Sequence, residues 1–226
     1  MNQRVLFLVI ALSLTVSGWS LCQAEMMEFQ ADYEWILPSG DLWSQGTGAE
    51  CKIIEWYESG VGVAFALGMA QWEADDASRT IVPWNGSIGR WERWQGDAQM
   101  IPIGLSLMIR SEDAMDEDTT LDVQLEAGFR YLMADSSLSL EERQDVLAGI
   151  GGPRESVYTS YGAELDDSWV GRVGVNCAWK WDYRTDLLTN IGYQFNLNKG
   201  QVKAGSVQQE VDMSGFIMQV GIGFHF

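Results

Sequence analysis

Residues 213–226 read Met-Ser-Gly-Phe-Ile-Met-Gln-Val-Gly-Ile-Gly-Phe-His-Phe and end the chain. From Phe216 onward every second residue is large and apolar, and most of the residues between them are small or polar. Such alternation places successive side chains on opposite faces of an extended chain, so it predicts a β-strand with one apolar face. A strand of a soluble sandwich can alternate in the same way, but it seldom ends on an aromatic residue with no polar tail. The pattern therefore favours a strand of a membrane barrel over a strand of a soluble all-β domain.

Seven further segments show the same alternation. They are residues 27–37, 48–57, 61–70, 99–109, 121–133, 169–181 and 187–197. Segment 48–57 leaves the assignment of its two faces open. Each segment is long enough for a tilted crossing of a bilayer, which needs about 9–11 residues. Together the eight segments predict an all-β fold, an eight-stranded antiparallel up-and-down transmembrane β-barrel.

The connections between these segments alternate in length. Those after the first, third, fifth and seventh strands have about 10, 25, 34 and 15 residues, whereas the others are short. Outer-membrane barrels have short periplasmic turns and longer extracellular loops, so we expect the long connections outside the cell. We expect residues 73–97 and the connection after 187–197 to be polar loops. Within 134–167 we expect a short helix over 139–148, in which Ser139 and Glu142 form a capping box.

The beginning of the chain predicts export. A basic amino-terminal region and an apolar stretch over residues 5–16 are typical of a secretory signal peptide and too short for a membrane span. Cleavage is expected after Ala24. Acylation of Cys22 is disfavoured because a leucine precedes it where lipoprotein signals have a small residue. The expected organisation is a signal peptide, residues 1–24, and one outer-membrane barrel domain, residues 25–226.

Composition excludes several ligands. The chain has 32 acidic and 14 basic residues, for a net charge of −18, so nucleic acid and anionic head groups are not expected partners of the body of the protein. One histidine and no cysteine cluster give no transition-metal signature, and we expect no cofactor. Five carboxylates in 111–118 match no calcium loop, so a solvated turn is expected there. Cys51 and Cys177 lie on strands expected to be too far apart for a disulfide.

Aromatic residues near the strand ends predict two interfacial girdles. One comprises Phe29, Tyr57, Trp179, Trp181, Phe224 and Phe226, and the other comprises Trp35, Tyr131, Trp169, Phe195 and Phe216. With this strand pattern and a terminal Phe226, the chain resembles the small eight-stranded bacterial outer-membrane proteins grouped as OmpA-like or OmpX-like barrels. The resemblance implies an outer-membrane location, contact with membrane lipid, and an assembly signal at Phe224 and Phe226 for the barrel-assembly machinery. We expect a monomer.

The inward faces of the predicted strands collect charge. The residues concerned are Glu28, Glu34, Glu50, Lys52, Asp122, Glu126, Arg130, Arg172 and Lys180. Side chains fill the interior of a barrel this narrow, and charges there must pair or remain hydrated. The first hypothesis is a charged plug in a protein with a structural or surface-interaction role and an unidentified loop partner. The alternative is a narrow pore for ions or small solutes, gated by exchange of ion pairs.

Enzymatic activity is not expected. Small barrels that modify lipid A need a histidine with a serine and an acid. The only histidine, His225, is expected on the lumen face at the periplasmic end, across the membrane from the outer leaflet, and no serine follows at a suitable spacing. An outer-leaflet lipid-modifying enzyme is therefore the third hypothesis, since fold alone does not identify function.

Overall fold

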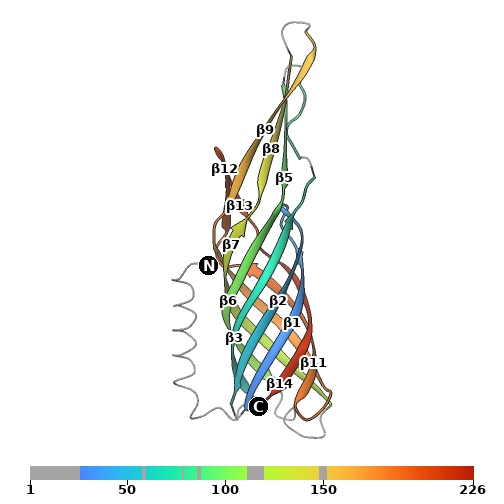
Figure 1. Cartoon of the computed structure of the whole chain (residues 1–226), viewed down its shortest axis with the longest axis vertical. Helices are drawn as coiled ribbons and strands as arrows, with labels where there is room; N and C mark the ends of the chain where they lie inside the picture. Colours follow the sequence, from blue (N-terminus) through green and yellow to red (C-terminus); the bar gives the residue numbers. More distant parts are fainter. Residues whose placement is uncertain (1–25, 58–59, 78, 86–87, 111–119, 148–151) are drawn as a thin grey trace.

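Figure 1 shows the computed structural model, in which a barrel continues along its long axis into a narrower β-structure. The structure describes residues 26–57, 60–77, 79–85, 88–110, 120–147 and 152–226. The predicted signal peptide and the acidic turn at 111–118 lie outside the described residues. Within these ranges, no helix is long and apolar enough to cross a membrane.

Eight of the strands that the structure describes close an antiparallel barrel. They are β1 (Met26–Pro38), β2 (Trp43–Trp56), β3 (Val61–Ala74), β6 (Asp97–Arg110), β7 (Leu121–Ser136), β10 (Ser168–Lys180), β11 (Thr185–Asn196) and β14 (Gly215–His225). Around the ring their order is β1-β14-β11-β10-β7-β6-β3-β2, and β2 pairs with β1. Each strand therefore pairs with the barrel strands that precede and follow it along the chain, and β14 closes the ring onto β1. The predicted eight-stranded antiparallel barrel is confirmed.

The predicted faces are confirmed as well. Along β14, Phe216 is 60 % exposed on the outer wall and Gln219 is buried in the lumen. The faces of β2 are now assigned, because Glu50 is buried and Cys51 is exposed. A wall of outward apolar side chains around a polar interior is the arrangement that a bilayer selects in a β-barrel. Cys51 and Cys177 are both free, as expected.

Aromatic side chains meet across neighbouring strands at both ends of the barrel wall. At the end nearer the narrow β-structure, the rings of Tyr131 and Trp169 pack with centroids 4.9 Å apart. At the other end, Phe29 of β1 lies directly opposite Phe224 of β14 in the strand register. These pairs come from the two predicted girdles, in the positions where aromatic side chains lie at membrane interfaces.

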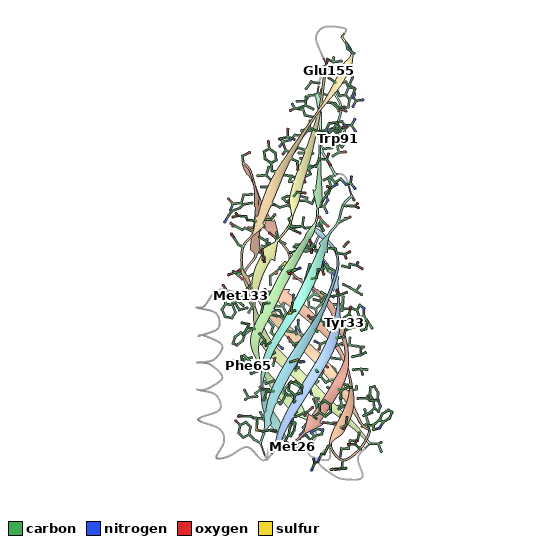
Figure 2. All side chains as sticks on the ribbon, in the orientation of Figure 1. Met26, Tyr33, Phe65, Trp91, Met133 and Glu155 are labelled. Atoms are coloured by element: carbon green, nitrogen blue, oxygen red, sulfur yellow. The ribbon has the colours of Figure 1, made fainter. Side chains whose placement is uncertain are left out.

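Beyond the barrel, three connections form strands rather than loops. They are β4 (Arg79–Val82) and β5 (Ile88–Gln95), then β8 (Ser139–Leu147) and β9 (Arg154–Leu165), then β12 (Gly200–Ala204) and β13 (Val207–Val211). These strands make a six-stranded sheet in the order β13-β12-β9-β8-β5-β4, which we call the extension. In Figure 2, Trp91 and Glu155 lie in the extension, far from Met26 at the opposite end of the molecule. The expectation of polar loops at 73–97 and after β11 is wrong.

The helix expected over 139–148 is wrong for a physical reason. Residues Ser139–Leu147 form β8, which pairs with β5 on one side and with β9 on the other. Leu140 and Asp145 are fully buried in this arrangement. A helix of this length is marginal on its own, whereas the strand gains backbone hydrogen bonds along two edges. Tertiary pairing therefore overrides the helix propensity of the sequence.

One hairpin of the extension carried a sequence signal for its turn. Strands β12 and β13 are joined by Gly205 and Ser206, and Gly205 has a φ of +58°. Only glycine adopts such a left-handed conformation at little cost, and a Gly-Ser pair between two short runs predicts a tight hairpin. The expected polar loop is thus a two-residue turn between paired strands.

A hydrophobic cluster joins the barrel to the extension. Its fully buried members include Trp72 of β3, Trp94 of β5, Leu140 of β8 and Val202 of β12, and it continues to Ile217 of β14. Because the cluster draws on barrel and extension strands together, the two parts share one core. The extension is thereby fixed to the end of the barrel from which its connections emerge.

Candidate functional site

Arg130 of β7 occupies the centre of the lumen and is fully buried. Its Nε donates to Glu50 Oε2 at 2.9 Å, and its Nη2 donates to Glu126 Oε1 at 2.9 Å. Its Nη1 donates to Ser106 Oγ at 2.8 Å, and the Ser106 hydroxyl donates to Glu126 Oε1 at 2.7 Å. The guanidinium thus joins strands β2, β6 and β7 across the barrel with charge-assisted hydrogen bonds, which are stronger than those between neutral groups.

Two other cations complete this group. Lys52 Nζ lies 2.8 Å from Glu126 Oε2, 3.6 Å from Glu50 Oε1 and 3.9 Å from Asp32 Oδ2. Arg172 Nη1 lies 3.3 Å from both Glu34 Oε2 and Glu50 Oε1. Glu50 is therefore shared by all three cations. Removing charges from water is costly unless they are paired in this way, and here every cation meets at least two carboxylates.

We call these seven charged residues the lumen cluster: Asp32, Glu34, Glu50, Lys52, Glu126, Arg130 and Arg172. Four strands supply them, namely β1, β2, β7 and β10, and Gln219 of β14 donates to Glu34 Oε2 at 3.1 Å. The remaining predicted residues, Glu28, Asp122 and Lys180, lie closer to the end of the barrel away from the extension. The structure thus brings together six of the nine predicted lumen residues.

Sequence reasoning missed several members of this site. Asp32 shares the inward face of β1 with Glu34, and Ser106 occupies the inward face of β6 between outward aliphatic residues. Alternation alone placed both side chains in the lumen. It gave no strand register, so it did not reveal that Lys52 reaches Asp32 or that Ser106 bridges Arg130 and Glu126.

Apolar side chains lie on both sides of the lumen cluster. Towards the extension the interior is occupied by the cluster around Trp72 and Ile217, and towards the other end by Ile54, Trp56 and Met108, all fully buried. Among the described residues, the lumen cluster therefore lies between a large apolar group towards the extension and a smaller one towards the other end, where Glu28 and Asp186 are also buried.

The extension carries a ladder of alternating tryptophan and arginine side chains. The Arg154 guanidinium lies 4.2 Å from the ring centroid of Trp84 and 5.9 Å from that of Trp91, over which Arg143 also lies at 5.1 Å. Asp145 holds both guanidinium groups, accepting from Arg143 Nε at 2.9 Å and from Arg154. The hydrogen bonds from Arg143 lower the pKa of Asp145 to about 2. We call Trp84, Trp91, Arg143, Asp145 and Arg154 the tryptophan–arginine ladder.

The outer wall has an interruption in one strand pair. Strands β3 and β6 are paired at Leu67 with Ile103 and again at Ala70 with Met100, but not at the two positions between. Pro102 lies in this gap, and its ring nitrogen has no hydrogen to donate towards β3. The proline in this strand thus coincides with an irregular ladder.

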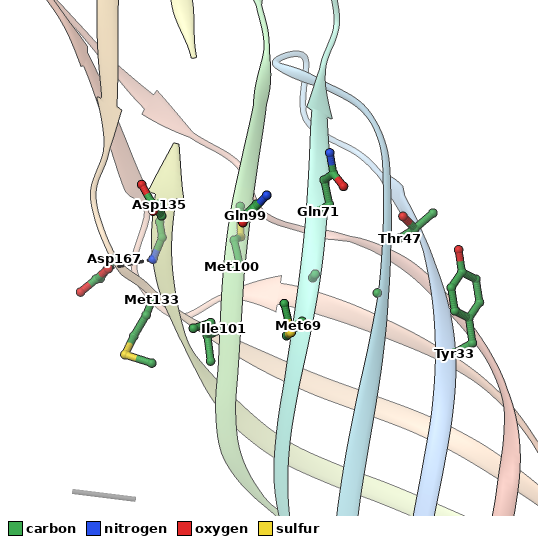
Figure 3. Close-up of a pocket in the computed structure, with 13 residues that line it drawn as sticks. Tyr33, Thr47, Met69, Gln71, Gln99, Met100, Ile101, Met133, Asp135 and Asp167 are labelled. Atoms are coloured by element: carbon green, nitrogen blue, oxygen red, sulfur yellow. Dashed lines mark hydrogen bonds between the residues drawn. The ribbon is translucent and has the colours of Figure 1, made fainter. Parts of the chain in front are cut away.

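A groove of about 760 Å³ opens at this interruption (Figure 3). Met69 and Ile101 form part of its apolar floor, whereas Gln71, Gln99 and Asp135 lie along its edge nearer the extension. An apolar floor with a polar edge suits a molecule with an acyl chain and a polar head group. The predicted contact with membrane lipid has a structural counterpart here.

Comparison with known proteins gives the fold and no assigned family. No family model and no curated protein matches the sequence. Among solved structures, the outer-membrane protein OprG from Pseudomonas aeruginosa matches with a TM-score of 0.60 and 11 % identity, over 90 % of this chain and 97 % of that one. The outer-membrane protein AlkL, solved in lipid bilayers, matches with a TM-score of 0.50 and 12 % identity over 90 % of each chain. The chain thus has the fold of eight-stranded outer-membrane β-barrels.

Proposed function

We propose that this protein is a bacterial outer-membrane surface protein whose barrel is a closed scaffold and whose extension recognises an extracellular macromolecule. The observation that carries the proposal is the combination of a filled lumen with a long, internally packed β-sheet beyond the barrel. A barrel that only conducts solutes has no need for such a sheet, whereas binding surfaces are commonly placed on segments that a rigid scaffold positions.

The filled lumen supports the scaffold role. Lys52, Arg130 and Arg172 are each at most 4 % exposed, and each is paired with carboxylates. Opening a water-filled path requires these groups to separate and the adjoining apolar layers to move. Because removing one member of a buried pair costs about 3–5 kcal/mol, the closed arrangement is strongly favoured over an open one.

The surface of the extension supports the recognition role. Tryptophan, tyrosine and arginine are the residues most enriched at protein-binding hot spots. Trp84 is 38 % exposed, and Tyr158 and Val157 are 60 % and 52 % exposed on β9. The tryptophan–arginine ladder holds Trp84 and Trp91 in fixed positions, so little entropy of these side chains is lost when a partner binds.

Two measurements test the proposal together. Wild-type protein in planar lipid bilayers should show conductance at background. Cells that express the protein should adhere to at least one member of a panel of immobilised extracellular proteins, and a Trp84→Ala/Trp91→Ala variant should lose this adherence. The control is Trp181→Ala, which truncates a 73 % exposed tryptophan at the other end of the barrel. Steady wild-type conductance refutes the closed scaffold. Equal adherence of the three proteins refutes recognition by the ladder.

A gated pore for ions or small solutes is the second candidate. The observation that favours it is the position of Glu50, which contacts Lys52, Arg130 and Arg172. A carboxylate shared by three cations allows pairs to exchange without leaving any charge alone. If the lumen cluster is a gate, Glu50→Gln should produce discrete conductance in planar bilayers that the wild type lacks.

A further inference from the structure

Three potential metal ligands meet at the end of the lumen away from the extension. Glu28 of β1, Asp186 of β11 and His225 of β14 each offer one ligand atom, and these atoms all lie within 4.8 Å of one another. The register explains the meeting, because Glu28 lies opposite His225 and Asp186 lies opposite Gly223, two residues from His225. The three side chains therefore point inward from three adjacent strands at one level of the barrel.

The hydrogen bonds leave acceptor capacity unused at this place. His225 Nε2 and Asp186 Oδ2 are 2.7 Å apart. Asp186 Oδ1 and His225 Nδ1 are buried and have no hydrogen-bond partner among the described residues. The Asp186 side chain is only 4 % exposed. A buried carboxylate oxygen without a hydrogen-bond partner costs free energy, and a bound ion compensates for the missing hydrogen bond.

Glu28, the third potential ligand, is held in position by two neighbouring hydrogen-bond donors. Trp56 Nε1 donates to Glu28 Oε2 at 2.8 Å, and Gln30 Nε2 donates to Glu28 Oε1 at 2.7 Å. Each oxygen still has a free lone pair, because a carboxylate oxygen accepts more than one bond. Donors of this kind orient the carboxylates of metal sites and contribute to metal affinity.

We propose that Glu28, Asp186 and His225 bind one divalent transition-metal ion of the zinc class. An imidazole with two carboxylates suits Zn²⁺ better than Ca²⁺ or Mg²⁺, which take oxygen ligands alone. The two carboxylates balance the charge of the ion. Other charged side chains among the described residues at this end include Arg110, Asp122 and Lys180 near the lumen, and Asp182 and Arg184 in the turn beside His225. Three protein ligands leave a fourth position for water.

A path to the site is present. A pocket of about 310 Å³ is lined by His225 together with Asp182, Thr185 and Phe226. An ion from the surrounding solution can reach the imidazole through it. Once bound, the ion links β1, β14 and β11, and so it strengthens the seam where the last barrel strand meets the first.

The test uses the full mature chain without a histidine tag, refolded in detergent and treated with a chelator. Titration with Zn²⁺ in a calorimeter should show one ion bound per chain. Asp186→Asn and His225→Gln should each weaken binding at least about 100-fold, since loss of a ligand exceeds the effect of losing an orienting neighbour. Asp182→Asn, a carboxylate that lines the same pocket, is the matched control and should bind as the wild type does. Folding of each variant is checked by heat-modifiable mobility in gels.

The single histidine gives a second readout that needs no substitution. In ¹⁵N-histidine-labelled wild type, the imidazole nitrogen signals should shift on addition of one equivalent of Zn²⁺. Unshifted signals, or no heat released by folded protein, overturn the proposal. Undiminished Zn²⁺ binding in both folded variants also overturns the proposal. Loss of Zn²⁺ binding when the carboxylates of 111–118 are replaced by amides, with His225 intact, overturns it as well.

Discussion

Replacement of Arg130 by alanine is the sharpest test of the lumen cluster. The substitution removes hydrogen bonds to Glu50, Glu126 and Ser106 from a site that is fully buried. It leaves two carboxylates with fewer counter-charges and a void where the guanidinium was. The free energy of unfolding should therefore fall.

The size of the loss in unfolding free energy depends on the ion pairs that Glu50 and Glu126 keep in Arg130→Ala. Removing one partner of a buried ion pair costs about 3–5 kcal/mol when the other charge is left alone. Here Glu126 keeps Lys52 at 2.8 Å, and Glu50 keeps Arg172 at 3.3 Å. We therefore expect the lower end of that range, about 3 kcal/mol. Methionine in Arg130→Met fills most of the volume of the arginine side chain but carries no charge. If this variant loses as much unfolding free energy as Arg130→Ala, the loss is due to the missing charge and not to the void.

The measurement is guanidinium unfolding in detergent micelles, followed by tryptophan fluorescence. Arg93→Ala is the matched control, because its ion pair with Asp76 is exposed and such pairs contribute about 0–1 kcal/mol. Conductance in planar bilayers is recorded for the same proteins. Background conductance with lost stability supports a plug, and a new small channel supports a gate. A loss below about 1 kcal/mol for Arg130→Ala contradicts the argument, because it means that the lumen is hydrated.

Three further outcomes are expected. Protease added to intact cells should cleave within 134–167 and leave 111–118 uncut; cleavage confined to the latter would reverse the proposed orientation. Deletion of Phe226, or Phe226→Asp, should lower the yield of heat-modifiable protein in outer-membrane fractions, and an unchanged yield would show that the terminal aromatic is no assembly signal. The pKa of Asp145 is lowered from 3.8 to about 2 in the folded protein, so its contribution to the stability of the extension is complete above about pH 4 and is lost as the pH falls through about 2. Protease resistance of the extension should fall over that interval in the wild type, and Asp145→Asn should remove this pH dependence.

The barrel was predictable because a bilayer imposes a simple rule on each strand. The outer face must be apolar and the inner face polar, so alternation in the sequence reports both the strand and its orientation. The rule was weakest for β2, whose two faces the sequence left open and where the structure buries Glu50 and Lys52. The same rule does not operate in the extension, which has water on its outside.

The strands of the extension were missed because their stability comes from pairing that the sequence does not display locally. The run Leu140 to Val146 has helix-forming residues, and its strand conformation depends on β5 and β9. A weaker signal was available in 79–82, where Thr80, Ile81 and Val82 are β-branched and typical of strands. The sequence placed Glu28 and His225 in the lumen but did not predict that they meet Asp186, since only strand register brings these three proposed ligands together.

The location of the charges adds a constraint on the partner. The lumen cluster has four carboxylates and three cations, so nearly all of the net charge of −18 lies outside it. In the extension each arginine is already paired with a carboxylate. The pairs are Arg79 with Asp75, Arg90 with Glu142, Arg93 with Asp76, and Arg143 and Arg154 with Asp145. An approaching molecule therefore meets an acidic surface whose arginines are already paired with carboxylates. A partner that is neutral or basic fits this surface, whereas a polyanion is repelled. If the partner is basic, adherence should weaken as salt concentration rises, because screening shortens the range of attraction to about 8 Å at physiological ionic strength.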